Sequence, residues 1–251
     1  MTDPFADHFS AVATGYATYR PHYPDALFDY LGSLANARNV AWDCAAGSGQ
    51  ATLALTAHFG RVIATDASEA QIGSAPAHPR VEYRVASAES SGLPAGSVDL
   101  VTVAQAVHWF DFERFYAEVR RVAAPRGIIA VWCYGMSRIG GAAIDDVLDR
   151  FYSGVVGPYW PPERRLIEEK YRTIPFPFAE VMPPAFDMLA DWTLPQMLGY
   201  LRTWSATWRY QAVHGADPVV ALESQLAPLW GDPGERRAVR WPLAVRVGRV
   251  G

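Results

Sequence analysis

A glycine-rich turn is the strongest chemical signal in the sequence. The segment Asp43-Cys44-Ala45-Ala46-Gly47-Ser48-Gly49-Gln50 follows an apolar run typical of a strand and precedes a stretch typical of a helix. Glycines in such a place let the backbone turn tightly and let a ligand approach the main chain at the start of a helix. We therefore expect Gly47 and Gly49 to line a ligand site.

A carboxylate follows at the position that a ribose would need. Asp66 ends the next apolar run, about twenty residues beyond the turn, where a carboxylate can accept hydrogen bonds from both ribose hydroxyls. The turn, its place between a strand and a helix, and Asp66 together predict a nucleoside site. The alternative is an ordinary tight turn followed by a surface aspartate.

Two residues bear on the type of ligand. A dinucleotide-binding pattern that starts at Gly47 would need a glycine at position 52, where the sequence has Thr52. Asp43, beside the turn, would repel a pyrophosphate and attract an ammonium group. Both residues disfavour a nicotinamide or flavin dinucleotide without excluding one.

A polar residue and an aromatic one stand after the fourth apolar run. His108 and Trp109 are expected at the carboxyl end of a parallel strand, where open α/β sheets bind ligands. His108 is the candidate general base, and a buried structural histidine is the alternative. Trp109 suits the packed wall of a pocket better than catalysis.

The elements that would position these residues alternate regularly between Asn39 and Tyr134. We expect strands over residues 39–44, 61–66, 81–86, 98–105 and 127–133, and helices over 49–59, 68–75 and 111–123. Ser68 and Asp111 are the expected N-caps of two of these helices. This alternation predicts an α/β fold with a doubly wound, mostly parallel sheet, whose carboxyl edge gathers the turn, Asp66 and His108.

The flanks depart from this pattern. Residues 5–35 are expected to form two helices broken at residues 20–24, and residues 136–235 an insertion before a final strand over 236–251. Within that insertion we expect a weak strand over 186–192 and helices over 194–211 and 218–230. The sequence thus predicts one domain, 1–251, with an N-terminal lid (5–35), a ligand-binding core (36–135) and a helical cap (136–235).

Composition narrows the class of protein. The 251 residues are 50% hydrophobic and 19% charged, with a formal net charge of −4, so we expect a globular chain without a nucleic-acid partner. Cys44 and Cys133 lie in apolar runs and predict reduced core thiols, with no metal site. No apolar run is long enough for a membrane span, and no targeting segment is recognisable, so we expect a cytoplasmic location and no membrane contact.

The core resembles the class I S-adenosylmethionine-dependent methyltransferases, which have a Rossmann-like fold. Asp43-x-Ala-x-Gly-x-Gly is similar to their first motif, with Ala45 in place of the usual first glycine. Asp66 matches their ribose-binding acid. Residues 86–89, 93–94 and 97–101 resemble the adenine-side loop and the strand after it, and residues 105–110 resemble the end of that strand.

The resemblance implies a set of ligand-binding positions. Asp43, Gly47 and Gly49 would line the methionine and ribose side, Ala88 and Glu89 the adenine, and Gln105 the sulfonium. The full implied cofactor set is Arg20, Asp43, Ala45, Gly47, Gly49, Asp66, Ala67, Ser87, Ala88, Glu89 and Gln105, and the implied substrate pocket is Tyr16, Tyr23, His108, Trp109 and Trp204. Ser87 replaces an aspartate common in the family and cannot bring its charge.

The flanks resemble one branch of that family. Tyr16, Tyr19, Arg20-Pro21-x-Tyr23-Pro24, Trp204-Ser205 and Trp241-Pro242-Leu243 are similar to the trans-aconitate methyltransferase-like group. This resemblance implies a small-molecule acceptor, with carboxyl O-methylation of an organic acid that Arg20, with Arg202 or Arg209, would hold.

Two alternatives stay open at this point. One is methylation of a hydroxyl or amine metabolite with His108 as the base, and the other is a non-catalytic S-adenosylmethionine-binding module.

Overall fold

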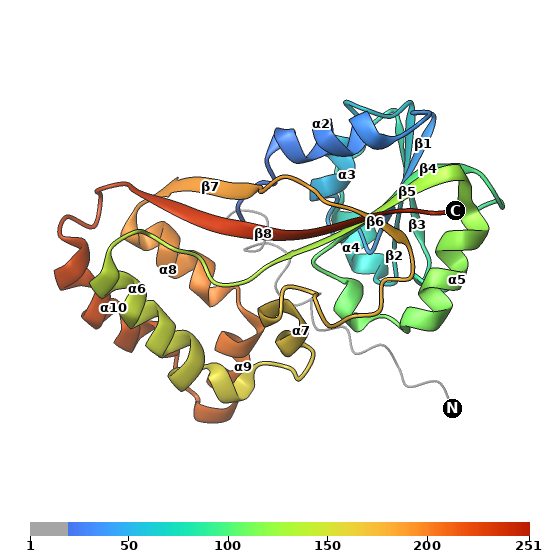
Figure 1. Ribbon diagram of the computed structural model, residues 1–251. Helices are drawn as coiled ribbons and strands as arrows, with labels where there is room; N and C mark the ends of the chain where they lie inside the picture. Colours follow the sequence, from blue (N-terminus) through green and yellow to red (C-terminus); the bar gives the residue numbers. More distant parts are fainter. Residues whose placement is uncertain (1–19) are drawn as a thin grey trace. The chain divides into compact units, whose positions relative to one another are not determined.

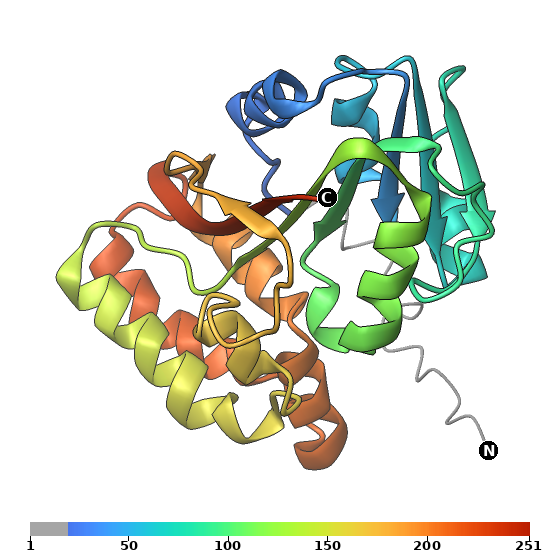
Figure 2. The same ribbon diagram turned by 45° about the vertical axis from the view of Figure 1, so that its right-hand side comes forward.

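The computed structural model describes residues 20–251, which fall into two compact units (Figures 1 and 2). The first, here called the sheet unit, comprises Tyr23–Gly135, Arg165–Asp187 and Pro242–Gly251. The second, here called the helical unit, comprises Met136–Arg164, Met188–Trp241 and, of the described N-terminal residues, 20–22. Residues 165–187 therefore group with the sheet. The division into lid, core and cap stays a prediction, and Tyr16, Tyr19 and residues 5–19 of the lid lie outside the described residues.

The sheet unit is built on strands in the order β3-β2-β1-β4-β5-β8-β6 (Figure 1). Strands β1 to β5 are parallel, and β8 runs antiparallel to both β5 and β6. The bounds are β1 Val40–Cys44, β2 Arg61–Asp66, β3 Val81–Val85, β4 Val98–Ala104, β5 Ala123–Tyr134, β6 Ala179–Val181 and β8 Arg237–Arg249, while β7, Asp187–Trp192, pairs with β8 outside this path. The expected doubly wound, mostly parallel sheet is confirmed.

Helices cover both faces of this sheet. The side chains of each strand point alternately to the two faces, so each face is buried against helices. On β5, Ile129, Val131 and Cys133 pack in the apolar cluster that includes helix α5, Phe112–Val122. The intervening Ile128, Ala130 and Trp132 pack in the cluster that includes α2, Asp25–Leu34, and α3, Gln50–Leu55. The sheet is thereby buried on both sides, as an α/β sheet requires.

Two helices of the sheet unit begin where the sequence predicts. The Ser68 hydroxyl accepts a hydrogen bond from Gln71 N at the start of α4, Glu69–Ser74. The Asp111 carboxylate accepts one from Arg114 N at the start of α5. Both caps satisfy a backbone N–H group that has no partner within its helix.

The helical unit packs around aromatic side chains. It contains α6, Ala142–Arg150, continued by a π-helical turn, Phe151–Val155, then α8, Leu194–Arg202, α9, Ser205–His214, and α10, Pro218–Trp230. Trp204 is 4% exposed and lies 5.5–6.2 Å, between ring centroids, from four other aromatic rings. These rings belong to Phe151, Tyr152, Trp160 and Tyr200.

The expectation of one continuous helix over residues 194–211 is wrong. Helix α8 ends at Arg202 and α9 begins at Ser205, because Thr203 and Thr207 turn their hydroxyls onto the backbone of α8. Thr203 Oγ1 donates to Tyr200 O over 2.6 Å, and Thr207 Oγ1 donates to Leu201 O over 2.8 Å. These side chains compete for carbonyl groups at the end of α8 and stop its ladder.

Candidate active site

The glycine-rich turn joins β1 to α3 in a strained conformation. Ala45, Gly47 and Gly49 all have positive φ angles, of 54°, 55° and 86°. A Cβ on Gly49 would meet Tyr83 Oη at 2.8 Å, whereas a Cβ on Gly47 would find no atom nearer than 3.8 Å. Gly49 is therefore required by crowding and conformation, and Gly47 leaves open space beside the main chain for a ligand.

Asp43 is a buried residue that connects the elements around this turn. Its side chain is 1% exposed, and it accepts hydrogen bonds from Thr52 Oγ1 at 2.6 Å and Thr102 Oγ1 at 2.9 Å. Burial raises the pKa of the Asp43 carboxyl to about 6, the two hydroxyls oppose that rise, and Asp66 adds to it. The carboxylate expected to attract an ammonium group thus holds β1, α3 and β4 together.

Asp66 receives two backbone groups at the carboxyl end of β2. Oδ2 accepts from Gly47 N at 2.8 Å, and Oδ1 accepts from Ser68 N at 2.9 Å. The two backbone N–H groups orient the Asp66 carboxylate, whose oxygens can each accept more than one hydrogen bond. The structure therefore brings Asp66 and Gly47 together, and Ala67, beside Asp66, is exposed.

The segment after β3 offers an apolar and a polar side chain. Ala88 is buried in the apolar cluster of the α5 face, and Ser87 is exposed and bridges to Ser90 through the backbone. Glu89 is half-buried, and its Oε1 accepts from Asp111 N at 3.2 Å. Ser87, Ala88 and Glu89 follow directly on the carboxyl end of β3, the strand beside β2.

Gln105 ties the ends of two strands together. It has a φ of 57°, its Nε2 donates to Tyr134 O, and its Oε1 accepts from Tyr134 N, each over 2.9 Å. This reciprocal pair closes the carboxyl edge between β4 and β5. Strained residues of this kind cluster at functional sites, where the surrounding structure holds them in place.

His108 lies in a 3-10 turn, Val107–Trp109, directly after that edge. Its ring is 7% exposed, and Nδ1 lies 2.8 Å from Tyr171 Oη. Trp109 is 36% exposed, with its ring 4.8 Å from that of His108. His108 is therefore buried and lies at the carboxyl edge of the sheet, and its role as a base stays a prediction.

The remaining candidates lie elsewhere in the chain. Tyr23 packs edge-on against Trp132 at 5.5 Å, inside the sheet unit. Arg20 belongs to the helical unit, where its guanidinium lies 5.5 Å from the centre of the Tyr200 ring. Trp204 is part of the aromatic core of that same unit.

Arg202 and Arg209 are both hydrogen-bonded within the helical unit. Arg202 Nε bonds Asp217 Oδ2 at 2.7 Å, and Arg209 Nη1 donates to Tyr159 O. The two arginines stand on different helices, α8 and α9, because the helix expected over residues 194–211 is broken.

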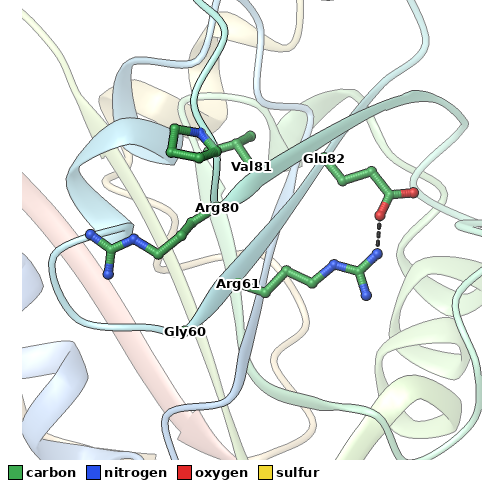
Figure 3. A pocket seen from close by; sticks show the side chains of 6 residues that line it. Gly60, Arg61, Arg80, Val81 and Glu82 are labelled. Carbon is green, nitrogen blue, oxygen red and sulfur yellow. Dashed lines mark hydrogen bonds and ion pairs between the residues drawn. The ribbon is translucent and has the colours of Figure 1, made fainter.

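A hollow at the opposite edge of the sheet is not part of this site (Figure 3). It lies at the amino ends of β2 and β3 and is lined by Gly60, Arg61, Pro79, Arg80, Val81 and Glu82. Arg61 forms an ion pair with Glu82 there, and hydrogen bonds from Arg84 and Arg61 lower the pKa of the Glu82 carboxyl. Ligands of open α/β sheets bind at the carboxyl edge, so this hollow carries no role in the proposed chemistry.

Sequence reasoning missed three residues that hold the site. Thr102 lies opposite Asp43 in the register of β1 and β4, so a strand alignment could have found it. Thr52 was weighed only as a departure from a dinucleotide pattern, although it donates to Asp43. Tyr171 is not among the predicted site residues, because nothing in its local sequence connects it with His108.

Two kinds of feature are absent from the part of the chain that the structure describes. Residues 20–251 contain no group of three His, Cys, Asp or Glu side chains that could hold a metal ion. Within the same range, no helix is long and apolar enough to cross a bilayer.

The strand order, the glycine turn after β1 and the acid after β2 together define the class I methyltransferase fold. Residues 42–131 match the family model described as a methyltransferase domain. A Dictyostelium discoideum protein named as a methyltransferase is 36% identical over 204 residues, which cover 80% of this chain and 78% of that protein. This chain belongs to the methyltransferase family and is an S-adenosylmethionine-dependent enzyme.

Two further comparisons agree. An uncharacterised methyltransferase of Mycobacterium bovis is 33% identical over 175 residues, which cover 69% of this chain and 66% of that protein. A solved structure from Anaeromyxobacter dehalogenans, assigned as a type II methyltransferase, has 48% identity and a TM-score of 0.88, and it covers 92% of this chain and 98% of its own. The fold is therefore shared along most of the chain.

Proposed function

We propose that this enzyme methylates a carboxylate oxygen of a small organic acid, as the resemblance to the trans-aconitate methyltransferase-like group implies. The observation that carries the proposal is His108, a buried and hydrogen-bonded side chain at the carboxyl edge of β4. A fixed imidazole beside apolar residues can orient a polar acceptor where little water competes. In such chemistry the protein contributes mainly placement and the exclusion of water.

The cofactor positions follow from the turn and its neighbours. Asp66 accepts the ribose hydroxyls, and the backbone at Ala45, Gly47 and Gly49 lies along the methionine side. Ala67, Ser87, Ala88 and Glu89 border the adenine, and Gln105 keeps the strand edge closed beside the reacting carbon. The structure is compatible with these roles because Gly47 leaves open space and Asp66 is already oriented. S-adenosylmethionine supplies, when bound, a methyl group on a positively charged sulfur that is a good leaving group.

The second candidate is methylation of a hydroxyl or amine, favoured by the same histidine. A carboxylate is already nucleophilic and needs no base, whereas a hydroxyl must lose a proton to a side chain such as His108. Arg20 favours the carboxylate, because a planar guanidinium can hold it through paired hydrogen bonds. In both cases Tyr23 and Trp109, which belong to the sheet unit, are the proposed aromatic neighbours of the acceptor.

A pH profile separates these acceptors. With labelled S-adenosylmethionine and a panel of carboxylic acids, phenols and amines, a carboxylate acceptor should give a flat rate between about pH 6 and 8, since its pKa is near 4. A steep rise near pH 6.5 that disappears in His108→Gln would replace the ester proposal with the base mechanism. Labelling of nucleic acid or protein in place of the panel would contradict a small-molecule acceptor.

Arg20→Lys tests the anion contact. Lysine keeps the charge and loses the planar fork, so the KM for the acceptor should rise while S-adenosylmethionine affinity stays constant. A fall in S-adenosylmethionine affinity would instead assign Arg20 to the methionine carboxylate. Arg202→Lys is the matched control, because that arginine is already paired with Asp217.

A further inference from the structure

His108 is held by a tyrosine from a distant part of the chain. Tyr171 is fully buried, its hydroxyl lies 2.8 Å from His108 Nδ1, and the two rings are tilted by 36° at 5.9 Å. Both residues belong to the sheet unit. The contact involves the Nδ1 nitrogen of His108. Whether Nδ1 or Nε2 carries the proton then decides whether Nε2 acts as a donor or as a base.

The backbone at Tyr171 is itself strained and supported. Lys170 and Tyr171 have φ angles of 58° and 57°, an arrangement that side-chain-bearing residues rarely adopt. Arg246 on β8 donates through Nη1 to Tyr171 O and to Ile174 O, each over 2.9 Å, and its Nη2 pairs with Glu180. Strain of this kind persists only where surrounding contacts over-determine it, and here they place one phenol against one imidazole.

The chemistry of the two groups decides the direction of the hydrogen bond. A phenol is a weak acid that readily donates, and a neutral imidazole nitrogen is a much stronger base than a phenol oxygen. The separation of 2.8 Å is compatible with a hydroxyl donor. We propose that Tyr171 donates to His108 Nδ1 and thereby fixes the tautomer that carries its proton on Nε2, so that His108 presents a donor and not a base.

This tautomer bears on the acceptor, and in that respect it rests on the proposed function. An Nε2–H group can donate to a carboxylate and orient it, but it cannot take a proton from a hydroxyl. Tyr171 is then a positioning residue that favours carboxylates over alcohols, and Arg246 supports it by holding its loop.

Nitrogen NMR of the whole enzyme tests the tautomer directly. The protein would be labelled with 15N-histidine and measured at about pH 8, where an ordinary histidine is neutral. His108→Gln identifies the resonances of His108 among the six histidines. An unprotonated Nδ1 with a proton on Nε2 is the expected result, and a proton on Nδ1 with an unprotonated Nε2 would overturn the proposal.

Tyr171→Phe provides the second measurement, with Tyr116→Phe as its matched control. Tyr116 is also buried in the sheet unit, but its hydroxyl donates to Pro175 O over 2.7 Å and does not touch His108. Tyr171→Phe should move the 15N signals of His108 and raise the KM for the acceptor about tenfold, the value of one hydrogen bond, with S-adenosylmethionine affinity unchanged. Tyr116→Phe should leave the 15N signals of His108, the KM for the acceptor and the S-adenosylmethionine affinity unchanged.

The two proposals fail separately. Unchanged 15N signals of His108 in folded Tyr171→Phe would overturn the tautomer proposal whatever the enzyme methylates. If instead those signals move but His108→Gln keeps full turnover, Tyr171 does set the tautomer and the proposed role of His108 in the acceptor site is wrong. Should Tyr171→Phe fail to fold, the spectrum of the unsubstituted enzyme still decides the tautomer.

Discussion

The Asp66 carboxylate orders the glycine turn as well as facing the proposed ligand. Its two oxygens accept Gly47 N and Ser68 N, which fixes both the turn after β1 and the start of α4. The same side chain is the proposed acceptor of the ribose hydroxyls. A substitution of Asp66 should therefore affect both the conformation of the glycine turn and the affinity for the ligand.

Asp66→Ala should weaken S-adenosylmethionine binding about 10- to 100-fold, since hydrogen bonds to a charged group contribute about 1.5–3 kcal/mol. Calorimetry gives the affinity, and thermal unfolding gives the accompanying loss of stability. Asp99→Ala is the matched control, because Asp99 Oδ2 accepts Asn39 N and Val40 N at the other end of β1. That variant should lose stability and keep its affinity, and unchanged affinity in Asp66→Ala would remove Asp66 from the site.

Ala45 adopts a backbone conformation that lowers the stability of the folded protein. With a φ of 54° it stands in the left-handed region, which costs a side-chain-bearing residue about 1–2 kcal/mol. Ala45→Gly should raise stability by up to about 1 kcal/mol after the added entropy of the unfolded chain, which raises Tm by about 2–4 °C. Ala46→Gly, at a position without a positive φ, should lower Tm. A lower Tm in Ala45→Gly would show that Ala45 is not strained.

Elements meet at Asp43. The carboxylate on β1 receives one hydroxyl from α3 and one from β4, so three elements are aligned beneath the turn by two hydrogen bonds. Burial raises the pKa of the Asp43 carboxyl, and the like charge of Asp66 adds to that rise. The buried charge of Asp43 lowers the stability of the folded protein at neutral pH, while its hydrogen bonds hold the turn in place.

Asp43→Asn should change how stability depends on pH. The pKa of Asp43 is about 6 when folded and near 4 when unfolded, so its contribution is complete below about pH 4 and is lost as pH rises through about 6. Asparagine does not titrate. The stability of Asp43→Asn relative to the unsubstituted protein should therefore increase by about 2 kcal/mol between pH 4.5 and 7.5. Urea unfolding at both pH values measures this difference, and a constant difference would contradict the raised pKa.

At the scale of the whole molecule, the sequence predicted the sheet better than the site. Strands β1 to β5 were predictable because apolar runs alternate with capped helices, and the turn and Asp66 because both lie at strand ends. The break at Thr203 was not, since threonine hydroxyls close on carbonyls only once the helix exists. The Tyr171–His108 contact joins residues 63 positions apart, and only the folded sheet unit brings them together.

The last prediction concerns the N-terminal segment, for which the sequence predicts a lid. Tyr23 packs against Trp132 and Tyr134 in the sheet unit, whereas residues 20–22 group with the helical unit. Deleting residues 1–22 therefore spares the Tyr23 packing and removes residues 5–22 of the predicted lid. The truncated enzyme should keep the sheet folded, by circular dichroism, but lose S-adenosylmethionine faster and turn over more slowly, because a lid excludes water from the reacting groups. Arg20→Ala in the full chain separates the loss of one guanidinium from the loss of the segment, and full activity in the truncated enzyme would eliminate the lid.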